Sequence, residues 1–207
     1  MSLLLACAVA ACGQPATDTS ANTIAAPVAA NGAATAPAPA PAAGEAAALK
    51  LSGAADAASI AATLAEAKRQ GMSDAKVTAA QSFRITEGGR EIATVLTGEG
   101  KMPDATFAGC FVALRTGDNV ELIPTLGYGD YEAQTCGGPT AVAILSSGDP
   151  VRFGMTFHSY SQDAEETVPM VVTWSRGDGS LLIDTELSTK AANSGIKTVA
   201  GMRPLVR

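Results

Sequence analysis

The chain has 207 residues, of which 20 are acidic and 14 are lysine or arginine, so its formal net charge is −6. Binding to nucleic acid needs basic side chains that neutralise phosphates, and the sequence has no basic stripe that would supply them. We therefore expect no nucleic-acid partner.

The first residues form a short apolar segment that ends at a cysteine. Residues 3–11 are too few to cross a bilayer, which takes about 20 apolar residues, but they match the apolar core of a signal peptide. The sequence Val-Ala-Ala-Cys-Gly at residues 9–13 resembles the lipobox of bacterial lipoproteins. Cys7 fits the same pattern but leaves almost no apolar core before it.

This resemblance implies that residues 1–11 are removed as a signal peptide and that Cys12 is acylated through its sulfur. Gly13 rather than aspartate follows the cysteine, which in lipoproteins of Gram-negative type implies the outer membrane, with the protein facing the periplasm. No lysine or arginine precedes Lys50, so the usual basic n-region is missing. We expect either a start upstream of this sequence or a different processing.

The segment that follows the lipobox is predicted to be a tether. Residues 12–48 are mainly alanine, proline, threonine, asparagine and glycine, with almost no charge. They cannot bury enough apolar surface to offset the entropy lost on ordering. The Ala-Pro alternation at residues 36–41 favours an extended, semi-rigid spacer between the membrane and a single domain at residues 49–207.

Two of the four cysteines remain in this predicted domain. An even pair in an exported domain favours a disulfide, here between Cys110 and Cys136. A metal site is the alternative, but it would need further cysteine or histidine ligands, and the chain has one histidine. We expect no metal and no cofactor.

The periodicity of apolar residues predicts a mainly β domain. Three- and four-residue spacing indicates a helix at residues 53–70, and a second, short helix should begin at Ser194 as N-cap and end at Pro204. Between them, period-two alternation predicts strands at residues 78–86, 91–97, 106–115, 120–126, 140–145, 151–160, 168–174 and 180–183. Short strands at such regular spacing favour an antiparallel sandwich or a partly open barrel.

His158, the only histidine, is the residue through which a Ser-His-Asp or Cys-His mechanism would have to run. Ser159 is its neighbour in sequence, but no G-x-S-x-G motif is present to expose a nucleophile. The alternation around His158 favours a polar residue on the outer face of a strand.

The loop before Cys136 is the second candidate site. It carries Tyr128, Asp130, Tyr131 and Glu132 between glycines, and the predicted disulfide would constrain it. Tyrosines give rigid contact area at low entropic cost, so the four residues could form an interaction surface. The alternative is that the tyrosines cap the edge of the sheet.

Three function classes follow from these observations. The first is a lipid-anchored envelope protein whose β domain binds another protein or an envelope polymer without catalysis. The second is an inhibitor or immunity lipoprotein against a cell-wall hydrolase, because acidic loops suit the basic clefts of lysozyme-like enzymes. The third is a hydrolase that uses His158 or a pair of carboxylates.

Overall fold

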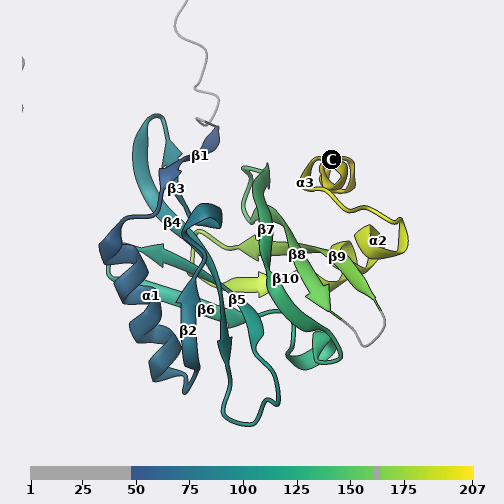
Figure 1. Ribbon diagram of the computed structural model, residues 1–207. Helices are drawn as coiled ribbons and strands as arrows, with labels where there is room; N and C mark the ends of the chain where they lie inside the picture. The colour runs from purple at the N-terminus through teal and green to yellow at the C-terminus, as the bar shows by residue number, and fades with distance from the viewer. Residues whose placement is uncertain (1–47, 161–163) are drawn as a thin grey trace, which may run out of the picture. The chain divides into compact units, whose positions relative to one another are not determined.

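Two antiparallel sheets form the framework of the protein (Figure 1). The computed structural model describes residues 48–160 and 164–207, which belong to one structural unit. The first sheet has the order β1-β3-β4-β5-β6, and β2 pairs with the distal part of β4. Its strands are β1 (Leu49–Ala54), β2 (Ser73–Val77), β3 (Phe83–Glu87), β4 (Arg90–Lys101), β5 (Gly109–Thr116) and β6 (Asn119–Pro124).

The second sheet has the order β10-β9-β8-β7. Its strands are β7 (Thr135–Ser146), β8 (Val151–Tyr160), β9 (Glu165–Trp174) and β10 (Leu181–Ile183). The sheets do not close into a barrel, so the structure confirms the predicted mainly β class and selects the sandwich.

The main core lies between the two sheets. Alternate residues of each central strand point inward, which buries the apolar set of one sheet against that of the other. On β8 these residues are Val151, Phe153, Met155 and Phe157, all fully buried, as the alternation in the sequence predicts. The same core includes Val95 of β4, Val112 and Leu114 of β5, and Met170 and Val172 of β9.

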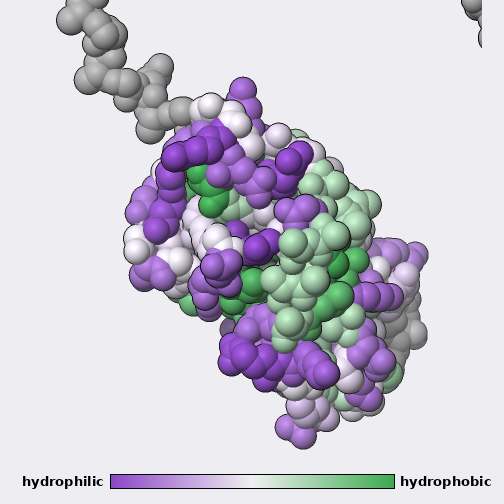
Figure 2. Space-filling view, turned by 90° about the vertical axis from the view of Figure 1, so that its left-hand side faces the viewer, coloured by the Kyte–Doolittle hydropathy of each residue, from purple (hydrophilic) through white to green (hydrophobic). Residues whose placement is uncertain are grey.

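Helix α1 (Ala57–Arg69) covers the outer face of the first sheet (Figure 1). It begins later than predicted, because β1 continues to Ala54 and Asp56 then acts as the N-cap. The helix turns small side chains, Ser59, Thr63 and Ala67, toward the sheet and leaves alanines exposed. The space-filling view of this side accordingly shows hydrophobic colouring over the helix (Figure 2).

The C-terminal helices cover the outer face of the second sheet, where Val171 packs with Ala191 and Met202. Helix α2 (Thr185–Asn193) was not predicted, and the predicted start of the last helix is wrong. Ser194 ends α2, and the chain turns at Gly195 with φ +66°. The short helix α3 (Val199–Met202) begins only after Thr198, whose hydroxyl caps it. The described residues also form three 3-10 turns: η1 (Ala79–Gln81), η2 (Gly129–Tyr131) and η3 (Arg203–Val206).

Helix α2 is bonded directly to β9. The hydroxyl of Ser188 accepts a hydrogen bond from the Val171 amide at 2.9 Å. The Asp184 amide donates to the Val171 carbonyl at 2.9 Å. Strand β10 pairs with β9 only at residues 172–174, so the N-cap and first turns of α2 take over the bonding of β9 beyond the end of β10.

Candidate functional site

A groove of about 680 Å³ opens at one end of the sandwich. Its two walls are the connection between β4 and β5, residues 102–108, and the connection between β6 and β7, residues 125–134. Both connections lie at the lower end of the molecule in Figure 1. Because loops held by a rigid sheet framework are the usual location of binding residues, this groove is the first candidate site.

Tyr128 fixes the shape of the groove by bonding to both ends of the opposite loop. Its hydroxyl accepts hydrogen bonds from the amides of Met102 and Gly109, each at 3.2 Å. The same hydroxyl donates to the Gly100 carbonyl at 2.7 Å. The phenol therefore closes the base of the 102–108 loop, and the groove exists before any ligand enters.

A disulfide also supports the end of the sandwich that carries the groove. Cys110 of β5 and Cys136 of β7 lie at disulfide distance, with their Cα atoms 5.3 Å apart, as the sequence predicts. Each belongs to a different sheet, so the bond joins the two layers of the sandwich. The Cys110 amide donates to the Leu126 carbonyl and the Thr125 amide donates to the Cys110 carbonyl, each at 2.8 Å, and these bonds attach the β6–β7 connection to β5.

Tyr131 is also built into the fold. It packs against the core between the sheets, and burial raises its pKa, with a further increase from Asp130 and an opposing hydrogen bond from Ser188. Of the four residues predicted as an interaction surface, the two tyrosines are thus partly buried and hold the loop, whereas Asp130 and Glu132 are exposed. Tyr128 thus bonds the ends of the opposite loop, and Tyr131 packs against the core.

The apolar part of the groove's rim comes from Phe107, which lies in a segment with a strand-like sequence pattern. Phe107 is 66% exposed, the most exposed large hydrophobic side chain among the described residues. Residues 106–108 were predicted to begin a strand, but β5 begins only at Gly109. Pro103 and Asp104, just before them, are the turn signal that could have identified a loop.

The charge of the groove is negative. Asp104 and Glu132 line it and are exposed, and none of the described residues that line it is lysine, arginine or histidine. Gln134 also lines it and has a buried Oε1 that accepts no hydrogen bond from the described residues. The charged side chains that line the groove are therefore carboxylates, which accept hydrogen bonds, and they lie in the same groove as an exposed aromatic ring.

His158 lies on the outer face of the second sheet. Its Nε2 is 3.1 Å from Oε1 of Glu165, and its ring contacts that of Tyr160 with centroids 4.9 Å apart. Ser159, its neighbour in sequence, is fully buried on the inner face. Because successive residues of a strand point to opposite faces, this serine cannot meet the imidazole. Among the described residues, no group of three or more His, Cys, Asp or Glu is placed to hold a metal.

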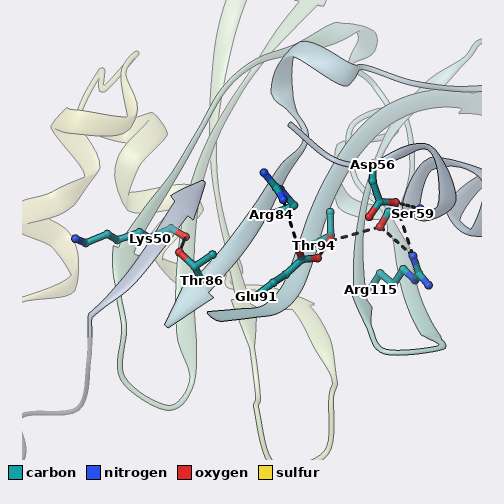
Figure 3. A network of polar contacts seen from close by, with 8 residues as sticks. All are labelled: Lys50, Asp56, Ser59, Arg84, Thr86, Glu91, Thr94 and Arg115. Atoms are coloured by element: carbon teal, nitrogen blue, oxygen red, sulfur yellow. Dashed lines mark hydrogen bonds and ion pairs between the residues drawn. The ribbon is translucent and has the colours of Figure 1, made fainter. Parts of the chain in front are cut away.

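A second, smaller cavity of about 350 Å³ lies beside the start of α1 and contains a polar network (Figure 3). Asp56 accepts from the Ser59 amide at 2.6 Å, which lowers the pKa of its carboxyl. Arg115 donates to the Ser59 hydroxyl at 3.0 Å, and this hydroxyl donates in turn to Thr94. These groups bond to one another, so the network attaches α1 to the first sheet and does not present free ligands.

The predicted lipidation site, Cys12, lies outside the described residues, as does most of the predicted tether. Within the described part of the chain, no helix combines the length and apolar character that a membrane span requires. A scan against protein-family models and searches of curated proteins and of solved structures each returned no match. The function is therefore inferred from the chain's own residues.

Proposed function

We propose that this chain is a bacterial envelope lipoprotein, anchored to the outer membrane through Cys12 and facing the periplasm. Its sandwich domain binds a partner in the groove between residues 102–108 and 125–134 and does not catalyse a reaction. The observation that carries the binding role is the exposed Phe107 on the rim of a groove that Tyr128 holds open. Aromatic residues are enriched at protein interfaces, so an exposed phenylalanine on the rim of a formed groove favours a binding role.

The surroundings of His158 favour binding over hydrolysis. Its partner Glu165 has a side chain that is 59% exposed, and the nearest serine in sequence points to the other face of the sheet. A general base works beside a positioned nucleophile in a site that excludes water. The contacts of His158 within residues 48–160 and 164–207 are instead this largely exposed carboxylate and the ring of Tyr160.

Site-specific photo-crosslinking tests the binding role. A photoreactive phenylalanine analogue is placed at position 107 of the full chain in the cells that make it, and a matched analogue is placed at position 182. Leu182 is 63% exposed but lies on β10, away from the groove. We expect an adduct with one envelope component from position 107 and none from position 182; equal labelling, or no adduct, would refute the proposal.

The anchor is tested separately by mass spectrometry of the purified, intact chain. We expect a mature N-terminus at Cys12 with acyl chains attached. An unmodified Cys12 preceded by residues 1–11 would refute the lipoprotein assignment.

The hydrolase-inhibitor role is a second candidate, favoured by the exposed Asp130 and Glu132 beside the groove. Carboxylates on a constrained turn complement the basic cleft of a lysozyme-like enzyme. Adding the full chain to such an enzyme acting on cell walls should lower its rate if this candidate is right, and an unchanged rate would eliminate it for that enzyme.

A further inference from the structure

We infer that the groove takes an extended, cationic and apolar segment of another protein rather than an envelope polymer. This inference rests on the proposed binding function and specifies its partner. Its starting point is the combination of Phe107, which is 66% exposed, with the exposed carboxylates of Asp104 and Glu132 in one groove.

Charge complementarity identifies the sign of the charge that the partner carries. The described lining residues include two carboxylates and no basic side chain, and the whole chain carries a net charge of −6. A lysine or arginine entering the groove would meet the carboxylates of Asp104 and Glu132. An anionic polymer would meet repulsion from the same groups.

The same argument disfavours occupants that belong to this chain. Residues 1–47 contain no lysine or arginine, so the segment before β1 has no side-chain cation to place between the carboxylates. A second copy would bring another net charge of −6 toward an acidic groove. A basic segment of a different protein is the occupant that fits.

The apolar residues of the groove indicate which side chains the bound segment carries besides its cations. Phe107 faces solvent at the rim, and Pro103, Pro124 and the ring of Tyr128 line the groove. An extended segment that alternates basic and aromatic side chains would place its cations on the carboxylates and its rings on Phe107.

Three fluorescent pentapeptides test the inference by anisotropy with the full chain: one alternating lysine and phenylalanine, one alternating glutamate and phenylalanine, and one alternating lysine and alanine. We expect the first to bind, with weaker binding as salt rises, and the other two to bind at least about tenfold more weakly. Equal binding of the glutamate peptide would overturn the inference.

Variants with matched controls locate the binding. Asp104→Asn combined with Glu132→Gln should weaken the lysine–phenylalanine peptide about tenfold, and Phe107→Ala should do the same. Asp118→Asn removes an exposed carboxylate from the turn at the other end of β5, and Leu182→Ala removes an exposed apolar side chain outside the groove. Neither control should change affinity, and a loss as large as in the groove variants would contradict the site.

The crosslinking experiment separates this inference from the function on which it rests. An adduct at position 107 whose contacted segment is acidic or a polysaccharide would refute the cationic segment and leave the binding function standing. Absence of any adduct would remove the binding function itself.

Discussion

The ring of Tyr128 occupies the space in which a side chain at Gly109 would lie. The glycine thereby lets the tyrosine approach β5 closely enough to bond the Met102 and Gly109 amides with one hydroxyl. One close contact between a β6–β7 residue and a β5 residue thus sets the geometry of the opposite loop.

Tyr128→Phe should destabilise the protein and loosen the 102–108 loop. The substitution leaves two amides and the Gly100 carbonyl without the phenol hydroxyl, which should cost about 1–3 kcal/mol in the free energy of unfolding. Urea unfolding measures the loss, and hydrogen exchange should show faster exchange at residues 102–109. Tyr160→Phe, in an exposed ring, is the control; an equal loss there would contradict the role given to Tyr128.

Removing the disulfide should weaken the connection between the sheets. Cys110→Ala combined with Cys136→Ala should lower the free energy of unfolding by an amount on the order of 3 kcal/mol, the value that loop-closure entropy gives for a loop of this size. Denaturant titration of both proteins under oxidising conditions measures the difference. Unchanged stability would mean that the bond does not constrain the unfolded chain.

Glu87, the last residue of β3, and Arg176, in the β9–β10 connection, form a bidentate ion pair with N–O distances of 3.0 and 2.9 Å. The guanidinium lowers the pKa of Glu87 and the carboxylate raises that of Arg176. A double-mutant cycle with Glu87→Gln and Arg176→Gln should show a favourable coupling that decreases as salt rises, because the pair is partly exposed. Additive effects of the two substitutions at low salt would exclude this coupling.

Asp178 should contribute to the acid limb of the stability curve. Hydrogen bonds from the Ser180 amide and hydroxyl lower its pKa from 3.8 to about 2. A depressed folded-state pKa gives stability that is present above the unfolded value and lost as pH falls toward the folded one. Asp178→Asn keeps the acceptor oxygen but does not titrate, so its urea midpoint should fall less between pH 4 and pH 2. Parallel curves for the two proteins would refute this assignment.

The central strands could be predicted from the sequence because their pattern is set by burial on one face. β8 has the predicted bounds, and the inward set from Val151 to Phe157 follows strict alternation. The pairing of Cys110 with Cys136 could also be predicted, because they are the two cysteines of the predicted domain. These features depend on the local alternation of apolar residues or on the number of cysteines, and both can be read from the sequence.

The peripheral elements and the groove could not be predicted in the same way. β1 and β2 are short strands with many exposed positions, and α2 is a polar helix whose contact with the sheet depends on small side chains such as Ser188 and Ala191. Phe107 fits a strand pattern locally, and its exposure follows from the loop that precedes Gly109. The groove joins two connections that are distant in sequence, so only the tertiary structure brings Asp104 to Glu132.

The bonding of α2 to β9 has a consequence for self-association. The Val171 amide could otherwise donate to a carbonyl of a neighbouring strand, but it already donates to the Ser188 hydroxyl. Since amides on one edge recur at every second residue, Pro169 lies on this same edge and has no amide hydrogen to offer. A strand from another molecule therefore finds no available donor at either position, which blunts this margin of the sheet against intermolecular β-pairing and aggregation.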